Sequence, residues 1–212
     1  MNPAPTDSRA RLLDSAVAIF RRKGYSATTV DDICSATGLS KGSFFHHFKG
    51  KEDLALAAVG HWNERTGALF AQAPYQQVQD PRARLLAYLD FRAELLRGDL
   101  PDVTCLLGTL VQESYDTHPA IRDACRAGIE DHAATLVPTI EAARTRYAPQ
   151  AEWTAESLAL FTQATLQGAF IVAKSRGTAQ AAAPLLAHLR AYVQGLLGGE
   201  RPAPTPRPRN KR

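Results

Sequence analysis

Cysteine is scarce in this sequence of 212 residues. Its three cysteines, Cys34, Cys105 and Cys125, are widely spaced and include no C-x-x-C pair. A disulfide framework needs an even set of cysteines, and a structural zinc site needs closely spaced ones. The sequence therefore argues against both, and we expect three reduced, partly buried thiols.

Long apolar segments are also absent, since the longest runs fall far short of the roughly 20 residues that a membrane-spanning helix needs. The N-terminal segment MNPAPTDSRAR has no apolar core like that of a signal peptide. Hydrophobic residues nevertheless make up 45% of the chain, which is enough to build a core. We therefore expect a folded cytoplasmic protein with no part in a membrane.

Motifs of the common enzyme classes are missing. The sequence contains no G-x-S-x-G, no Walker loop, no H-E-x-x-H and no dinucleotide fingerprint. Its carboxylates stand beside arginines, which is the pattern of solvated helix faces. We expect a protein that is not an enzyme and that uses no cofactor and no metal.

The net charge of +4 is unevenly distributed. Residues 1–60 carry eight Lys/Arg against six Asp/Glu, and residues 61–200 carry twelve against fifteen. The last twelve residues, RPAPTPRPRNKR, carry five basic residues and no acid. The basic character therefore comes mostly from this tail, and the overall charge is weak support for nucleic-acid binding.

Helical spacing of apolar residues dominates the sequence, and alternating β-branched runs are absent. We predict one helix that ends near Gly24 and three more that begin at Thr29, Ser40 and about Lys51. Five helices follow, over about residues 81–97, 103–115, 119–146, 152–175 and 180–198, with a kink at Pro138. The expected fold class is all-α, with about nine helices.

Capping residues define two short helices before residue 50. The Thr29 hydroxyl is placed to accept from the amide of Asp32, whose side chain reaches back in a weaker form of the capping box. Ser40 caps the next helix, and Leu39 and Phe44 stand at the two positions of a hydrophobic staple. The two helices are joined by a tight turn.

This arrangement around the turn Thr37-Gly38-Leu39-Ser40 is a helix-turn-helix pattern. In that motif the second helix enters the major groove, and its first residues meet the base edges. Lys41 offers a charge to phosphate or a hydrogen bond to guanine, while Gly42 lets the helix backbone approach the duplex. His46 and His47 are adjacent, so their side chains point about 100° apart, which argues against a metal site.

The segment TTVDDICSATGLSKGSFFHHFKGKEDL, residues 28–54, resembles the DNA-binding head of the TetR/AcrR family of repressors. The match extends back to about Arg9 and includes the F-x-x-x-G-Y link at Phe20, Gly24 and Tyr25. The resemblance implies phosphate contacts near the start of the second and fourth helices, and a groove-facing surface on the third. The DNA-binding residues that it implies are Thr28, Thr29, Ser40, Lys41, Gly42, Ser43, Phe45, His46, His47 and Lys51. Phe45 stands where many members have tyrosine, so one hydroxyl contact is missing.

The resemblance also implies a helical body and a regulatory function. We expect a DNA-binding domain over residues 8–54, a ligand-binding and dimerisation domain over residues 55–199, and a disordered basic tail over residues 200–212. The implied function is a repressor that binds palindromic double-stranded operator DNA as a homodimer and is released by a small-molecule effector. A two-fold dimer would set its recognition helices about 34 Å apart, which is one turn of DNA.

Candidate ligand contacts are aromatic and apolar side chains with a few polar ones, which together suit a small-molecule cavity. They are Trp62, Tyr88, Phe91, Cys105, Leu106, Thr109, Glu113, Phe170 and Lys174. Core packing is an open alternative for each of them.

Small residues on the predicted helix 152–175 would allow close helix contact across a dimer interface. They are Thr162, Ala164, Thr165, Gly168 and Ala169. Packing within one chain is the alternative.

Three further questions stay open. The segment CLLGTLVQESYDTHPAIRD, which begins at Cys105, resembles a TetR subgroup in which some members respond to reactive electrophiles or to unsaturated small acids. Cys105 is therefore a candidate sensing thiol, or a residue that lines the effector site. The regulator is alternatively an activator, or is controlled by a partner protein without a ligand. The tail either adds nonspecific DNA affinity or only solubilises the chain.

Overall fold

The computed structural model describes residues 5–198, and the side chains from residue 8 onward. Its regular secondary structure in that range is helical, which confirms the all-α prediction. The first helices are α1 (Pro5–Lys23), α2 (Val30–Thr37), α3 (Lys41–His47), α4 (Lys51–Ala71) and α5 (Pro81–Glu94). They are followed by α6 (Leu100–Val103), α7 (Leu106–Ser114), α8 (Pro119–Ala134), α9 (Val137–Tyr147), α10 (Ala155–Arg176) and α11 (Ala183–Leu196). Short 3₁₀ segments are η1 (Pro74–Gln77), η2 (Leu95–Arg97) and η3 (Ala179–Ala182).

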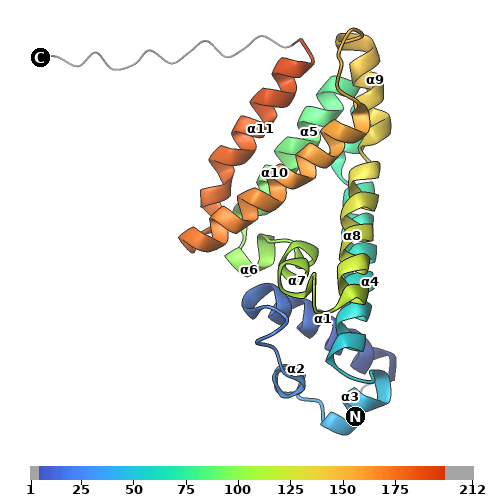
Figure 1. The fold of residues 1–212 in the computed structure, drawn as a ribbon, viewed down its shortest axis with the longest axis vertical. Coiled ribbons are helices and arrows are strands. Elements are labelled where there is room, and N and C mark those ends of the chain that lie inside the picture. The colour runs from blue at the N-terminus through green and yellow to red at the C-terminus, as the bar shows by residue number, and fades with distance from the viewer. Residues whose placement is uncertain (1–4, 199–212) are drawn as a thin grey trace, which may run out of the picture.

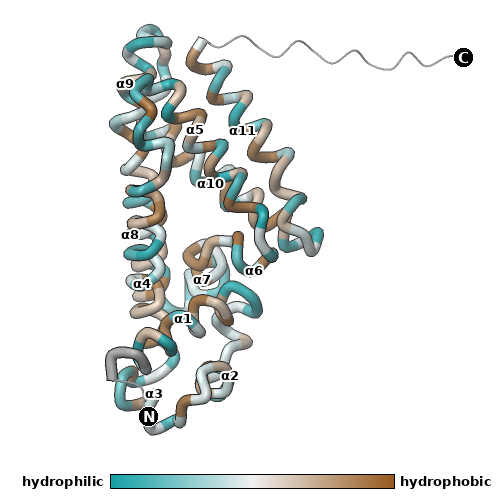
Figure 2. The backbone as a smooth tube through the Cα atoms, turned by 180° about the vertical axis from the view of Figure 1, so that it is seen from behind, coloured by the Kyte–Doolittle hydropathy of each residue, from teal (hydrophilic) through white to brown (hydrophobic). Residues whose placement is uncertain are grey.

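The helices form a small head and a larger body (Figure 1). Helices α1, α2 and α3 lie together at one end of the molecule, with the start of α4. Helices α4 and α8 run side by side from the head into the body, α11 lies on the opposite side, and α10 crosses the body obliquely between them (Figures 1 and 2). Helices α6 and α7 lie between the head and α10.

Two predicted helices are interrupted in the structure. The predicted helix 103–115 is divided, because Thr104 and Cys105 adopt extended conformations between α6 and α7. The predicted helix 119–146 ends at Ala134, and Pro138 lies in the first turn of a separate helix, α9. Proline is tolerated in a first turn because no hydrogen-bonding N–H is needed there. Pro138 therefore stands at the start of a new helix and does not kink a continuous one.

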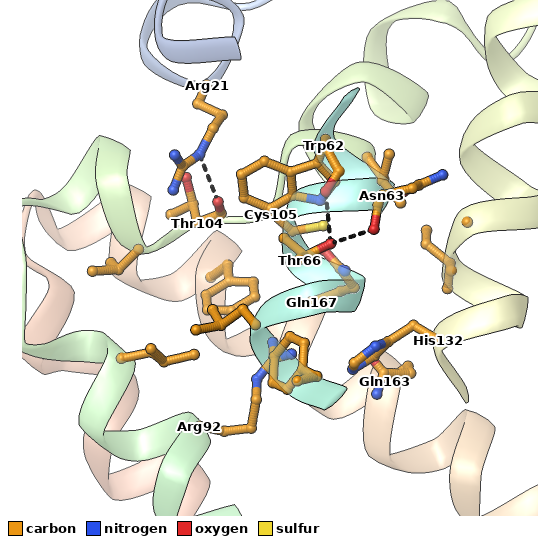
Figure 3. Close-up of a pocket in the computed structure, with 18 of the residues that line it drawn as sticks. Arg21, Trp62, Asn63, Thr66, Arg92, Thr104, Cys105, His132, Gln163 and Gln167 are labelled. Carbon is orange, nitrogen blue, oxygen red and sulfur yellow. Dashed lines mark hydrogen bonds between the residues drawn. The ribbon is translucent and has the colours of Figure 1, made fainter. Parts of the chain in front are cut away.

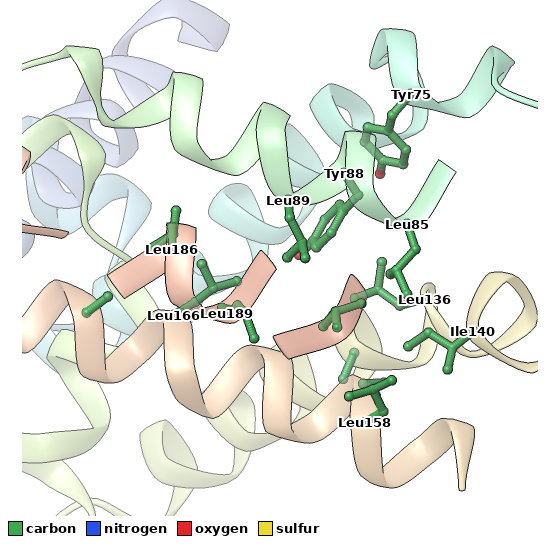
Figure 4. Close-up of a cluster of buried hydrophobic side chains, with 14 of the residues drawn as sticks. Tyr75, Leu85, Tyr88, Leu89, Leu136, Ile140, Leu158, Leu166, Leu186 and Leu189 are labelled. Atoms are coloured by element: carbon green, nitrogen blue, oxygen red, sulfur yellow. The ribbon is translucent and has the colours of Figure 1, made fainter. Parts of the chain in front are cut away.

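Two clusters of buried apolar side chains hold the fold together. The body cluster joins α5, α9, α10 and α11 and includes Tyr88, Leu89, Ile140 and Leu166 (Figure 4). The head cluster includes Phe20, Ile33, Phe44 and Leu54 from α1–α4. It continues into α7 and α8 through Leu106, Leu107, Leu110, Ile121 and Cys125. The head therefore packs its core against α7 and α8 of the body.

Helices α10 and α11 carry large apolar side chains that point away from both clusters. Phe161 and Tyr192 are 44% and 51% exposed, and their rings lie 5.2 Å apart. Leu160 and Ile171 on α10 are also about half exposed. Hydrophobic stretches recur along both helices in Figure 2. Of the small residues predicted at a dimer interface, Thr162 and Ala169 instead pack inside the chain.

The predicted tail at residues 200–212 lies outside the described residues. Among the described helices, none combines the length and the hydropathy that crossing a membrane would take.

Candidate functional site

The turn between α2 and α3 has the geometry that the sequence predicts. The Thr29 hydroxyl accepts from the amide of Asp32, and the Thr29 amide donates back to the Asp32 carboxylate at 2.7 Å, so the capping box is present. Gly38 ends α2 with φ of +66°, a left-handed conformation that glycine adopts without strain. The Ser40 hydroxyl then accepts from the Ser43 amide and begins α3. The helix-turn-helix is thereby fixed by its own side chains.

Helix α3 is anchored on one side and open on the other. Phe44 is fully buried, whereas Phe45 is 56% exposed and Lys41, Gly42 and His46 are exposed. A Cβ at Gly42 would meet only the Ser40 hydroxyl at 3.6 Å, an ordinary contact. Since glycine within a helix costs about 0.5–1 kcal/mol relative to alanine, the fold itself gives no reason for it. A glycine here leaves the helix backbone accessible to an approaching duplex.

An ion pair links the two helices on this open side. The Lys41 ammonium lies 2.8 Å from the Asp31 carboxylate, and both side chains are about two-thirds exposed. The hydrogen bond from Lys41 to Asp31 raises the pKa of Lys41. Behind this pair, Lys23 bonds Asp32 at 2.6 Å, and this bond with those from Thr29 lowers the pKa of Asp32 to about 2. Lys41, which belongs to the predicted groove-facing surface, is therefore paired with a carboxylate of the neighbouring helix.

The predicted phosphate contacts differ in their availability. Thr29 is exposed at the start of α2. The Thr28 side chain, in contrast, is fully buried, and its hydroxyl donates to the Gly24 carbonyl at 2.6 Å. The interpretation of Thr28 as a phosphate contact therefore needs correction, because its hydroxyl is used inside the head. Lys51 is half-buried and donates to the Tyr25 carbonyl at 2.9 Å, with its ammonium 4.3 Å from the centre of the Tyr25 ring.

A cavity of about 170 Å³ lies in the body, between α4, α6, α8 and α10 and close to α1 (Figure 3). Of the predicted ligand residues, Trp62, Cys105 and Phe170 line it. Its polar lining comes from Arg21, Asn63, Thr66, Arg92, Asp102, Thr104, His132, Gln163 and Gln167. Its apolar lining is completed by Leu69, Phe70, Leu95, Val103, Leu107, Gly128 and Ile129. Apolar walls with a few convergent polar groups are typical of small-molecule sites.

The other predicted ligand residues lie beside this cavity or away from it. Tyr88 is buried behind the wall, where its hydroxyl accepts from the Gln163 amide at 3.1 Å and lies 3.1 Å from His132 Nε2. Phe91 packs edge-on against Phe70, which lines the cavity.

Four further candidates have other positions. Lys174 donates to Thr109 at 2.6 Å in a smaller hollow that adjoins the cavity. Leu106 is fully buried in the head cluster. Glu113 accepts from the Ser26 amide at 2.8 Å and so joins α7 to the head.

Sequence reasoning missed the charged side chains and the imidazole of the cavity. Arg21 lies on α1 of the head, yet its guanidinium is buried against Trp62, 4.7 Å from the ring centre, and its Nε donates to the Thr104 carbonyl at 2.8 Å. Burial lowers the pKa of Arg21. Arg92 stacks against the rings of Phe70 and Phe170, at 5.1 and 5.8 Å from their centres. Burial and the nearby Arg92 lower the pKa of His132 to about 4, so its imidazole is neutral at pH 7.

No local sequence pattern identifies these residues as part of a cavity, because each is a single polar side chain on a helix that also has exposed faces. Arg21 stands between Phe20 and Arg22 and resembles the solvated end of α1. The cavity brings it together with residues 40 to 150 positions away, which helical periodicity cannot predict.

Comparison with known protein families gives two matches that together span most of the chain. Residues 12–58 match the model described as bacterial regulatory proteins, tetR family. Residues 81–189 match the model described as the tetracyclin repressor-like C-terminal domain.

Individual proteins match at different lengths. The HTH-type transcriptional regulator LmrA of Bacillus subtilis is 26% identical over 193 residues, which are 90% of this chain and 97% of LmrA. A TetR transcriptional regulator from Chloroflexus aurantiacus has a similar crystal structure, with a TM-score of 0.78 and 31% identity, covering 90% of this chain and 96% of that one. The uncharacterized regulator YerO of Bacillus subtilis is 39% identical over 56 residues, and this match spans 26% of this chain but only 19% of YerO.

Proposed function

The chain belongs to the TetR family of DNA-binding transcriptional regulators, and from this premise we propose that it is a repressor, not an enzyme, that leaves its operator when a small molecule fills the body cavity. The observation that carries the proposal is the open side of α3. This short helix is fixed at Ser40 and Phe44 and presents a glycine, a cation and imidazoles outward. That combination suits the major groove, where side chains read base edges and a close backbone approach is needed.

In the proposed complex, the head over residues 8–54 contacts the operator through α2, α3 and the start of α4. Lys41 and the imidazoles of His46 and His47 reach bases or phosphates, and Gly42 admits the backbone. The remaining proposed contacts are Thr29, Ser40, Ser43, Phe45 and Lys51. Lys51 would exchange its bond to the Tyr25 carbonyl for one to phosphate.

The body over residues 55–199 is proposed to form the homodimer. The supporting observation is the set of half-exposed apolar side chains on α10 and α11, which include Phe161, Ile171 and Tyr192. Apolar side chains gathered on adjacent helices mark interaction surfaces more often than scattered ones do. A two-fold axis through this surface would place the two α3 helices about 34 Å apart, on successive turns of a palindrome.

Release from DNA is proposed to be a shift between two arrangements of head and body. Helix α4 supplies Lys51 to the head and Trp62 to the cavity, so it connects the two sites directly. A ligand favours release only if it binds the DNA-free arrangement more tightly than the operator-bound one.

The test is selection of genomic fragments by the purified full chain at physiological salt. We expect recovery of a short palindrome with half-sites one helical turn apart. The Lys41→Met variant should lose affinity, whereas Arg97→Met, which removes an exposed cation from the body, serves as the control. Recovery of fragments with no shared sequence would contradict the proposal. A reporter gene placed behind the palindrome then distinguishes repression from activation.

A second mode of control rests on Cys105. Cys34 and Cys125 are buried, whereas Cys105 is partly exposed and lines the cavity. An electrophile that entered the cavity would meet this thiol. If Cys105 senses electrophiles, an electrophile releases the wild-type protein from DNA but does not release the Cys105→Ser variant. If both proteins are released alike, Cys105 is not the sensor. A regulator that only a partner protein controls would respond to neither electrophiles nor other small molecules.

A further inference from the structure

The cavity holds cationic side chains that lack acidic partners. Arg21 is 9% exposed and has one hydrogen bond from its guanidinium, to the neutral carbonyl of Thr104. Arg92 is half-buried and meets aromatic rings. Among the side chains of residues 8–198, no carboxylate lies within 4.0 Å of either guanidinium, although nine other ion pairs do form.

Charged groups removed from water are normally paired, because an unpaired buried charge costs several kcal/mol. Asp102 also lines the cavity. Its carboxylate raises the pKa of Arg21, but by less than burial lowers it. Asp102 is itself exposed to solvent, so it does not supply a buried counterion. The imidazole of His132, which also lines the wall, is neutral at pH 7 and contributes no negative charge. The wall therefore has a net positive character.

The volume of the cavity limits the size of the ligand that can fill it. Its volume of about 170 Å³ is close to that of cavities of about 150 Å³ that bind benzene. Trp62, Phe70 and Phe170 supply apolar surface, and Arg21 and Arg92 enter from different sides of the cavity (Figure 3). An inorganic ion would leave these rings without a partner.

We propose that the cavity binds a small organic carboxylate with an apolar body about the size of a benzene ring, anchored by Arg21 and Arg92. This inference rests on the proposed function, because it names the ligand class of the same cavity. A carboxylate matches the two parallel donors of a guanidinium and forms charge-assisted hydrogen bonds with it. The apolar body then packs against Trp62 and the phenylalanine rings.

The two anchors have different consequences for the head. Arg92 lies on α5, within the body. Arg21 lies on α1, which belongs to the head, and its bond to the Thr104 carbonyl ties α1 to the junction between α6 and α7. A carboxylate that binds the Nε edge of the Arg21 guanidinium takes the place of that carbonyl as the acceptor. Arg21 is therefore the residue through which the ligand acts on the head, while Arg92 contributes affinity alone.

The experiment uses three probes of similar size and different charge, namely benzoate, benzyl alcohol and benzylamine. Binding to the full chain is measured by calorimetry and by the fluorescence of Trp62 in the Trp153→Phe variant, which leaves one tryptophan. We expect saturable binding of benzoate, with the alcohol and the amine about ten- to hundredfold weaker, because a hydrogen-bonded charge is lost or reversed. Equal binding of the three probes, or no binding of benzoate, overturns the inference.

Variants then assign the two anchors. Arg92→Met and Arg21→Met should each weaken benzoate binding about ten- to hundredfold, while the exposed Arg97→Met leaves it unchanged. Arg21→Lys, which keeps the charge, shows whether any loss in Arg21→Met reflects failure to fold. If both arginines can be removed without loss of benzoate binding, the assignment is wrong.

A second readout separates affinity from action on the head. With a DNA fragment recovered as above, saturating benzoate should release the Arg92→Met variant but not the Arg21→Met variant. Release of both variants would contradict the role given to Arg21. If no specific fragment is recovered at all, the proposed function fails, whereas the charge preference of the cavity is still decided by calorimetry.

Discussion

His132 shows how one half-buried side chain makes the stability of the protein depend on pH. Its imidazole lies 3.1 Å from the Tyr88 hydroxyl and 4.5 Å from the Phe70 ring centre. Burial and Arg92 lower its pKa from 6.5 to about 4 in the folded state. The unfolded chain therefore binds a proton at this residue below pH 6.5, while the folded chain does not until about pH 4.

Stability should consequently fall as the pH is lowered from 6.5 toward 4. Between pH 7.5 and pH 5, the His132→Gln variant should lose about 2 kcal/mol less unfolding free energy than the wild type. Urea unfolding at the two pH values measures this difference. Carboxylates such as Asp32, whose pKa is about 2, titrate below this window and affect both proteins alike. An equal loss in the two proteins would show that His132 is not the group responsible.

Gly24 is a second residue whose position the fold strictly limits. Its φ is +84°, and a Cβ there would lie 1.9 Å from Glu113 Oε1, on the side chain that holds the Ser26 amide. Alanine would therefore strain the backbone and displace the contact between head and α7. We expect Gly24→Ala to lower the free energy of unfolding by about 1–3 kcal/mol.

Gly60 provides the matched control, since it lies in helix α4 and an added Cβ would meet no other part of the structure within 4 Å, apart from its own helix backbone. Gly60→Ala should raise the free energy of unfolding by about 0.5–1 kcal/mol, because alanine is the better helix former. Chemical denaturation of both variants tests the pair. Similar effects at the two glycines would mean that neither φ nor Glu113 limits position 24.

At the scale of elements, an ion pair between α2 and α3 is expected to weaken DNA binding. Asp31 on α2 places a carboxylate next to Lys41 on α3, on the side that we propose faces phosphate. Asp31→Asn removes a repulsive charge and frees the ammonium. It should raise operator affinity several-fold and steepen its salt dependence, whereas Lys41→Met should lower the salt slope by about 1.

Binding isotherms at several salt concentrations measure both slopes. Asp90→Asn is the control, because Asp90 pairs with Arg190 and belongs to α5, a helix of the body that lies away from α3 (Figure 1). If Asp31→Asn binds DNA more weakly than the wild type, the pair orients Lys41 for binding instead of restraining it.

Local signals predicted the helices of the head better than the architecture of the cavity. The caps at Thr29 and Ser40 act within three residues, so sequence spacing alone defines them. The break at Thr104 and Cys105 was missed, because neither residue excludes a helix by itself. Long-range contacts, such as the bond of Arg21 to Thr104, decide the conformation there. For the same reason Trp62, Cys105 and Phe170 were selected for the cavity by residue type, while Arg21 and Arg92 were not.

At the scale of the whole molecule, the proposed assembly depends on α10 and α11. Ile171 on α10 is 49% exposed. Ile171→Arg would place one charge from each protomer in an apolar interface, and a two-fold axis doubles the cost. We expect this variant to be a monomer by light scattering at concentrations where the wild type is a dimer. Tyr115→Arg, at a 63% exposed residue next to α7, should leave the mass unchanged.

The same variant tests whether the dimer is the DNA-reading unit. The head of Ile171→Arg keeps its own core, since the head cluster contains no residue of α10 or α11. Each monomer should then bind a half-site with its ordinary contacts but lose the gain from a linked second head. Affinity for the full palindrome should fall about 10²–10⁴-fold, toward that for a single half-site. If the monomeric variant binds the palindrome as tightly as the wild type, the heads act independently, and release cannot work by changing the distance between them.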